Sequence, residues 1–154
     1  MSVTPQVFVQ IIAAERSAVW KALTRPEFTS QYWHGTRVRS DFRVGSVVEF
    51  LVEGDEVGCR GEVLISEPPT TLSYTWQFPG NPRVRDEAPS RVTFHLETLG
   101  APSGEQATRL TVIHDHFPSG SHMPEMVRPG WPAVLAGLKT LLETGQTPDF
   151  SSMT

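Results

Sequence analysis

The sequence predicts an α+β domain in which one long helix covers an antiparallel sheet. Six segments in the middle of the chain alternate apolar and polar side chains with a period of two, as strands with one buried face do. A helical apolar stripe follows them near the C-terminus. Because a sheet with one apolar face needs a covering layer, we expect this helix to supply it.

The N-terminal part predicts one strand and two short helices. Residues 7–12 form a β-branched run that is typical of a strand. Between residues 14 and 23, apolar side chains recur at helical spacing. Pro26 suits the first turn of a second helix that ends near Tyr32, and Gly35 follows where a helix terminator is expected.

The six alternating segments predict six further strands, which makes about six to seven strands in all. They are residues 37–42, 48–53, 57–65, 72–78, 92–97 and 109–114. Gly54 and Asp55 fit a tight hairpin turn. Residues 100–106 predict a hairpin connection, and the Pro- and Gly-rich residues 79–89 predict a mobile loop.

The long C-terminal helix is predicted after an irregular segment, residues 117–129. Its apolar stripe consists of Trp131, Val134, Leu135, Leu138, Leu141 and Leu142. Pro132 fits its first turn, and Gly145 fits its C-terminal cap. We therefore expect a single domain over residues 1–145 and a frayed tail over residues 146–154.

Composition excludes several classes of function. The chain has 154 residues and a net charge of -4, which argues against broad binding to nucleic acid or to anionic membranes. No segment approaches the roughly 18 apolar residues of a membrane span, and no secretory signal opens the sequence. The single Cys59 permits no internal disulfide. We therefore expect a cytoplasmic protein.

Short segments spread along the chain resemble a known family. They are residues 18–24, 26–27, 32–33, 44–46, 61–63, 68–69, 72–76, 92–94, 108–112 and 130–139. In this order and spacing they resemble the activator-of-Hsp90-ATPase-homologue-1-like family of the START-like, or Bet v 1-like, superfamily. The resemblance covers residues 7–145. It implies a helix-grip fold: a curved sheet wrapped around a long C-terminal helix, with two short N-terminal helices and a central cavity.

Strand alternation and the helix stripe together predict which side chains line that cavity. They are Phe50, Tyr74, Trp76, Phe78, Phe94 and His114 from the strands, Trp131, Leu135 and Leu138 from the helix, and Trp33, Met123 and Met126 at a mouth. Aromatic and methionine side chains suit a small apolar ligand. The alternative is that they form an ordinary packed core. No phosphate or dinucleotide motif is present, so no cofactor is expected.

The histidines suggest two further hypotheses. His114 and His116 share one face of a strand, and His122 and His34 could approach them, as in an open zinc site. Their spacing matches no established zinc signature, and a strand that ends at Phe117 and Pro118 with solvated histidines at its rim explains them better, so no metal is expected. His114 and Tyr74 could instead orient a ligand by hydrogen bonding, and His114 could act as a general base in an enzyme.

Three functions remain open. Non-enzymatic binding of a small apolar or aromatic molecule is favoured. The second is a protein-interaction module of the Hsp90-activator type, including a homodimer, with Trp33, Phe117 and Met123 as candidates for an exposed patch. The third is a polyketide cyclase-like or hydrolase-like enzyme, which needs an inward-facing acid–base pair.

Overall fold

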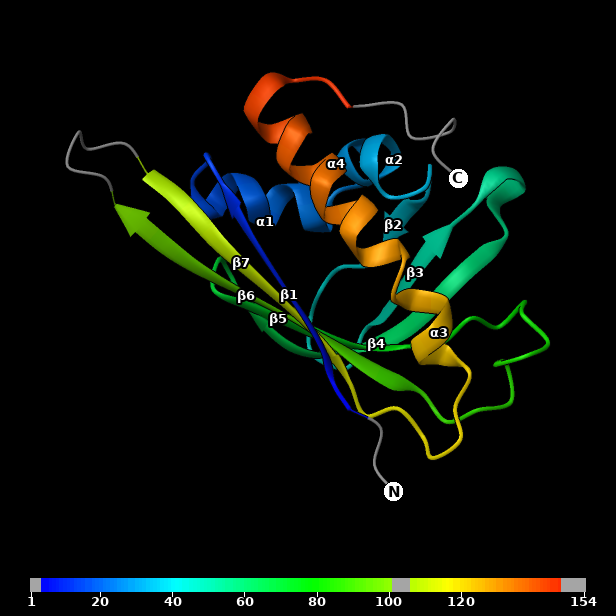
Figure 1. The fold of residues 1–154 in the computed structure, drawn as a ribbon. Helices are drawn as coiled ribbons and strands as arrows, with labels where there is room; N and C mark the ends of the chain where they lie inside the picture. The colour runs from blue at the N-terminus through cyan, green and yellow to red at the C-terminus, as the bar shows by residue number, and fades with distance from the viewer. Residues whose placement is uncertain (1–3, 101–105, 148–154) are drawn as a thin grey trace.

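A curved antiparallel sheet, covered on one face by helices, forms the computed structural model (Figure 1), which describes residues 4–100 and 106–147. The strands are β1 (Gln6–Ile12), β2 (Arg37–Arg39), β3 (Val47–Leu51), β4 (Val57–Glu67), β5 (Thr71–Trp76), β6 (Ser90–Gly100) and β7 (Gln106–Asp115). Their order in the seven-stranded sheet is β1-β7-β6-β5-β4-β3-β2, and all neighbours are antiparallel. The predicted fold class is confirmed.

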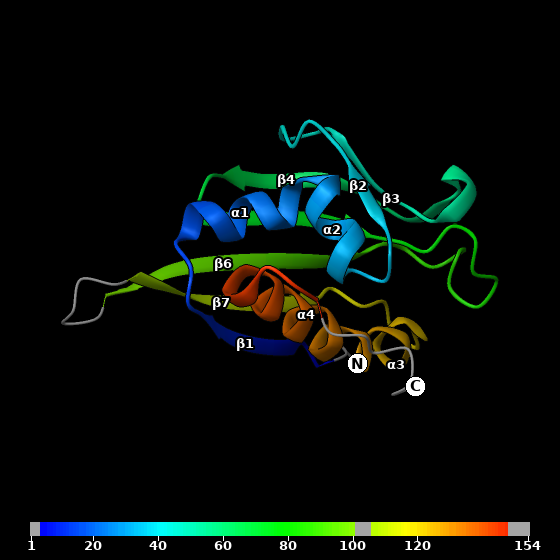
Figure 2. The same cartoon turned by 90° about the horizontal axis from the view of Figure 1, so that it is seen from above.

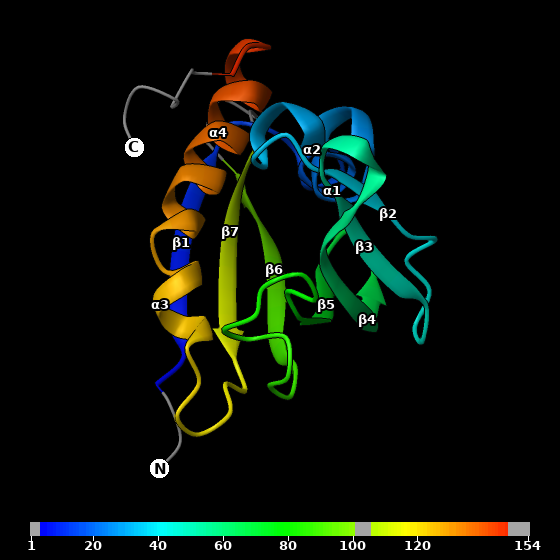
Figure 3. The same cartoon turned by 90° about the vertical axis from the view of Figure 1, so that its right-hand side faces the viewer.

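The α-helices lie together on the concave face of the sheet. They are α1 (Arg16–Thr24), α2 (Pro26–Tyr32), α3 (Met123–Val127) and α4 (Gly130–Thr144). A short 3₁₀-helix, η1 (Glu53–Asp55), connects β3 and β4. Figure 2 shows α1 and α2 beside one another on the β4 side, and α4 on the side of β7 and β1. In Figure 3, α3 and α4 follow one another along β1. The sheet therefore grips α4 on one side and the two N-terminal helices on the other.

The long helix has the predicted boundaries. Trp131, Leu135 and Leu138 lie on its buried face. Gly145 ends it in the left-handed conformation, with φ of 79°, which glycine adopts without a Cβ clash. No helix within the described ranges is long and apolar enough to cross a membrane.

Strand ends and register differ from the sequence prediction in three places. The strand predicted over residues 37–42 ends at Arg39, because Phe42 takes a left-handed conformation with φ of 54°. Leu51, predicted to face outward, is buried, since the register shifts between Phe50 and Leu51. Ile65, predicted to face inward, is exposed for the same reason, because the register also shifts between Val63 and Ile65. Bulges of this kind reverse the facing of the residues that follow.

The connections also hold more structure than the sequence pattern indicated. The segment predicted as irregular contains α3, whose Met123 and Val127 are buried. Pro124 lies in its first turn, where a missing N–H breaks no helical hydrogen bond. Val84, in the 79–89 loop, is buried in the core cluster and anchors that loop. Residues 101–105 and 148–154 lie outside the described residues, so most of the predicted hairpin connection and of the predicted tail is not described.

Gly61 in β4 provides a test of the packing between β4 and β5. A Cβ at this position would lie 1.8 Å from the carbonyl oxygen of Thr75, whereas a Cβ at Gly100 would meet nothing within 4 Å. We expect Gly61→Ala to lower the free energy of unfolding by about 2–3 kcal/mol, because backbone must move to admit the methyl group. Gly100→Ala should leave it nearly unchanged. Urea unfolding measures both, and equal stability of the two variants would contradict this packing.

Candidate functional site

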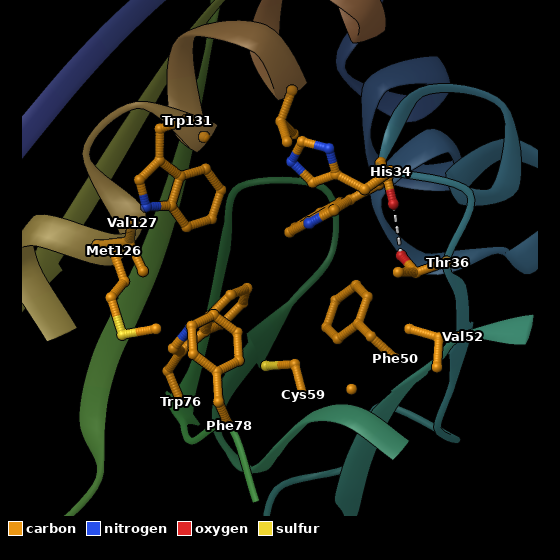
Figure 4. Close-up of a pocket in the computed structure, with 14 residues that line it drawn as sticks. His34, Thr36, Phe50, Val52, Cys59, Trp76, Phe78, Met126, Val127 and Trp131 are labelled. Carbon is orange, nitrogen blue, oxygen red and sulfur yellow. Dashed lines mark hydrogen bonds between the residues drawn. The ribbon is translucent and has the colours of Figure 1, made fainter. Parts of the chain in front are cut away.

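A pocket lies between the sheet, the end of α2 and the beginning of α4 (Figure 4). Its volume is about 200 Å³. It is lined by Trp33, His34, Thr36, Phe50, Val52, Gly58, Cys59, Trp76, Phe78, Met126, Val127, Gly130, Trp131 and Val134. The pocket therefore occupies one end of the concave face, where the curved sheet and the helices diverge.

Three buried tryptophans form its inner walls. Trp33 follows α2, Trp76 ends β5 and Trp131 lies in the first turn of α4. Their ring centroids are 6.2 Å apart for Trp33 and Trp76, 5.6 Å for Trp33 and Trp131, and 5.5 Å for Trp76 and Trp131. Rings at these spacings are in favourable aromatic contact. Large, stiff side chains from three separate elements thus hold the pocket's shape.

The backbone around Trp33 is fixed by local hydrogen bonds. Its N–H donates to the carbonyl of Thr29 at 2.8 Å. Its own carbonyl accepts from the Thr36 hydroxyl at 2.7 Å, the dashed line in Figure 4. His34 and Gly35 both have positive φ and turn the chain away from α2. This tight turn carries the Trp33 ring into the core and leaves His34 at the surface.

The outer part of the pocket is a partly exposed rim. Phe78, Met126, Val52 and Thr36 are half-buried, and His34 is exposed. Phe78 comes from the sheet side and Met126 from α3, as Figure 4 shows. Because its rim is partly exposed while its inner walls are buried, the pocket can be reached from solvent.

The lining is mostly apolar. It contains no Asp, Glu, Lys or Arg among the described residues. Burial raises the pKa of the Cys59 thiol far above its usual range, so the thiol stays protonated and is a poor nucleophile. The free energy of binding a ligand in this pocket would therefore come mainly from dispersion contacts and from the burial of apolar surface.

His114 lies beside the pocket in a closed hydrogen-bond chain. The Trp131 indole N–H donates to Nδ1 of His114 at 3.2 Å. The neutral ring therefore carries its proton on Nε2, which donates to the Ser90 hydroxyl at 2.8 Å. That hydroxyl is 3.4 Å from the carbonyl of Trp76, to which it donates. Because burial lowers the pKa of His114 to about 3 and both nitrogens are engaged, this imidazole is unsuited to act as a general base near neutral pH.

The structure divides the twelve residues predicted to line a cavity into two groups. Those that line the pocket are Trp33, Phe50, Trp76, Phe78, Met126 and Trp131. Those buried in the packed core outside this lining are Tyr74, Phe94, His114, Met123, Leu135 and Leu138. Tyr74, for example, packs between Phe50 and Phe94 with ring centroids 6.1 and 5.8 Å away. The alternation of apolar and polar residues identifies the inner face of a strand. It does not show over what length of the strand the helices pack against that face.

Eight lining residues were not in that predicted set. They are His34, Thr36, Val52, Gly58, Cys59, Val127, Gly130 and Val134. Three could have been found from the sequence, since Cys59 and Val52 share the predicted inner faces of their strands and Val134 belongs to the helix stripe. The others come from turns, a strand end, α3 and the first residue of α4, where the predicted periodicity carries no information.

The remaining sequence hypotheses concern histidines and exposed apolar side chains. His116 is exposed in a left-handed conformation just after β7, and His122 is exposed beside Arg83. Within the described ranges, no three His, Cys, Asp or Glu side chains are grouped to hold a metal ion. The patch predicted from Trp33, Phe117 and Met123 is wrong, because all three are buried.

A curved antiparallel sheet that grips a C-terminal helix beside an apolar pocket defines a helix-grip domain. The family model described as "Activator of Hsp90 ATPase homolog 1-like protein" matches residues 13–143. The chain belongs to this family, as its sequence resemblance predicted.

Solved structures share the fold. Protein MLL2253 from Mesorhizobium loti is 27% identical, with a TM-score of 0.72 over 91% of this chain and 97% of that one. An Hsp90 activator from Plasmodium falciparum, PFC0360w, is 16% identical, with a TM-score of 0.73 over 90% and 96%. The Aha1 dimer from Colwellia psychrerythraea is 20% identical, with a TM-score of 0.69 over 93% and 98%. No curated protein sequence matches the chain.

Burial of neutral His114 makes stability depend on pH. A histidine in the unfolded chain has a pKa near 6.5, well above the folded value of about 3. Between these values only the unfolded state takes up the proton, so stability is complete above about pH 6.5 and falls as the pH falls. We expect the wild type to lose about 2 kcal/mol more than His114→Gln between roughly pH 7 and pH 5. Urea unfolding checks this, and equal losses would contradict it.

Proposed function

We propose that the pocket binds a small, neutral, apolar or aromatic molecule and catalyses no reaction on it. The observation that carries this proposal is a cavity of about 200 Å³ walled by three tryptophans. A protein cavity of about 150 Å³ with apolar walls is known to accept benzene. A ligand of one or two rings therefore suits this volume.

The lining favours binding over catalysis. An enzyme of the cyclase or hydrolase type needs a positioned acid and base. The lining offers an exposed His34 at the rim and the protonated thiol of Cys59, but no carboxylate. His114, the base considered from the sequence, is held neutral by burial and bonds to Trp131 and Ser90.

Binding of a second copy or another protein is a second candidate function. Val7, Val9 and Ile11 expose apolar side chains on β1, which lies at an edge of the sheet. Exposed apolar side chains on an edge strand are a common route to association. Two proteins of the same fold are described as an Hsp90 activator and as a dimer. Sedimentation velocity at rising protein concentration tests self-association.

Toluene tests the pocket directly, because it fits the cavity and has no polar group. We expect it to bind the wild type with a submillimolar to millimolar dissociation constant, measured by isothermal titration calorimetry. Val134→Phe should weaken this binding at least about tenfold, since the larger side chain fills the pocket from α4.

Val9→Phe is the matched control for this experiment. It makes the same chemical change on the exposed face of β1, where Val9 is 56% exposed, and should leave the toluene affinity unchanged. Far-ultraviolet circular dichroism verifies that both variants are folded. Unchanged binding in Val134→Phe, or equal weakening in both variants, would contradict the proposed site.

A further inference from the structure

One wall of the pocket carries a hydrogen-bond donor without a partner. Among the described residues, the buried side-chain polar atoms that lack one are Gln6 Oε1 and Trp76 Nε1. Trp76 lines the pocket and is 5% exposed. The donor thus belongs to a side chain that lines the cavity in which a ligand is proposed.

The environment of Trp76 explains why this donor is unusual. Native proteins pair nearly all their buried N–H groups, and an unpaired one is destabilising. Trp131, in the neighbouring wall, obeys this rule by donating to His114 at 3.2 Å. The Trp76 nitrogen has almost no accessible surface, so side chains around it must move before an acceptor can reach it. What the indole N–H of Trp76 lacks is a hydrogen-bond acceptor.

We infer that the ligand of this pocket carries a neutral hydrogen-bond acceptor, such as a ketone or amide carbonyl, that accepts from Nε1–H of Trp76. This rests on the proposed function and narrows the ligand class. Because the indole N–H can only donate a hydrogen bond, the ligand group that pairs with it must be an acceptor. The described lining has no Lys or Arg to neutralise an anion, and an unpaired charge is strongly disfavoured in an apolar site.

The side chains around the indole allow such a contact to form. Phe78 meets the Trp76 ring edge-on, with centroids 5.8 Å apart. Met126 extends on the nitrogen side of the indole in Figure 4. Both are only partly buried and belong to the rim. Methionine is unbranched and adapts its conformation readily, so this rim can rearrange to admit a carbonyl oxygen to the indole nitrogen.

A pair of probes of matched shape tests this inference. Acetophenone and α-methylstyrene differ by a carbonyl oxygen in place of a methylene group, so one has the acceptor and the other lacks it. We expect the ratio of their dissociation constants, α-methylstyrene over acetophenone, to fall about tenfold from wild type to Trp76→Phe. Comparing ratios cancels the different hydration of the probes and the altered cavity of the variant.

A second readout uses the wild-type protein alone. In a spectrum of ¹⁵N-labelled tryptophan, the Nε1 proton of Trp76 should move downfield with acetophenone and not with α-methylstyrene. Trp76→Phe assigns this signal by its loss, and Trp76→Tyr can replace it if the phenylalanine variant does not fold.

The possible outcomes separate the inference from the proposed function. One set of results overturns the inference while the pocket remains a binding site. In it, both probes bind, the ratio of their dissociation constants is the same in wild type and Trp76→Phe, and the Trp76 proton does not respond to acetophenone. Binding of toluene with neither probe bound would also overturn the inference alone. Absence of binding by all three compounds would overturn the proposed function as well.

Discussion

The hydrogen bond from Trp131 to His114 determines where the long helix begins on the sheet. It joins the first turn of α4 to β7 inside the core. Nε2–H of His114 donates a second hydrogen bond to the hydroxyl of Ser90, at the start of β6. Because a buried polar group must find a partner, a displacement of α4 would leave the Trp131 donor or the imidazole unpaired. This bond fixes the position of the Trp131 ring, and hence one wall of the pocket.

The pocket follows from this fixed wall and from the curvature of the sheet. Trp33 contacts both Trp76 and Trp131, so the turn after α2 supports the wall that α4 supplies. Farther along α4 and the sheet, smaller side chains such as Leu138 and Val112 are fully buried. The rings of Trp33 and Trp76 that wall the pocket are stiff and meet Trp131 at 67° and 45°. The cavity lies where these rings meet, and its described lining, which has no Asp, Glu, Lys or Arg, suits uncharged ligands.

The sequence predicted the fold well, because alternation and helical periodicity record which side chains face the core. It also placed Trp76 and Phe78 on the pocket side of the sheet and Trp131 on the inner side of the helix. It could not locate the bulge between Phe50 and Leu51, which depends on strand pairing. Nor could it distinguish His114 as a structural residue from His114 as a ligand contact or a base, because that role depends on hydrogen bonds between segments distant in the chain.

The most direct test of the central claim is an isotope-filtered nuclear Overhauser experiment on the protein saturated with toluene. If the tryptophan-walled cavity is the binding site, toluene protons should show contacts to the indole protons of Trp33, Trp76 and Trp131, whose rings lie within 6.2 Å of one another. Contacts to Val7 and Val9 on the exposed edge strand, without contacts to these indoles, would contradict the account.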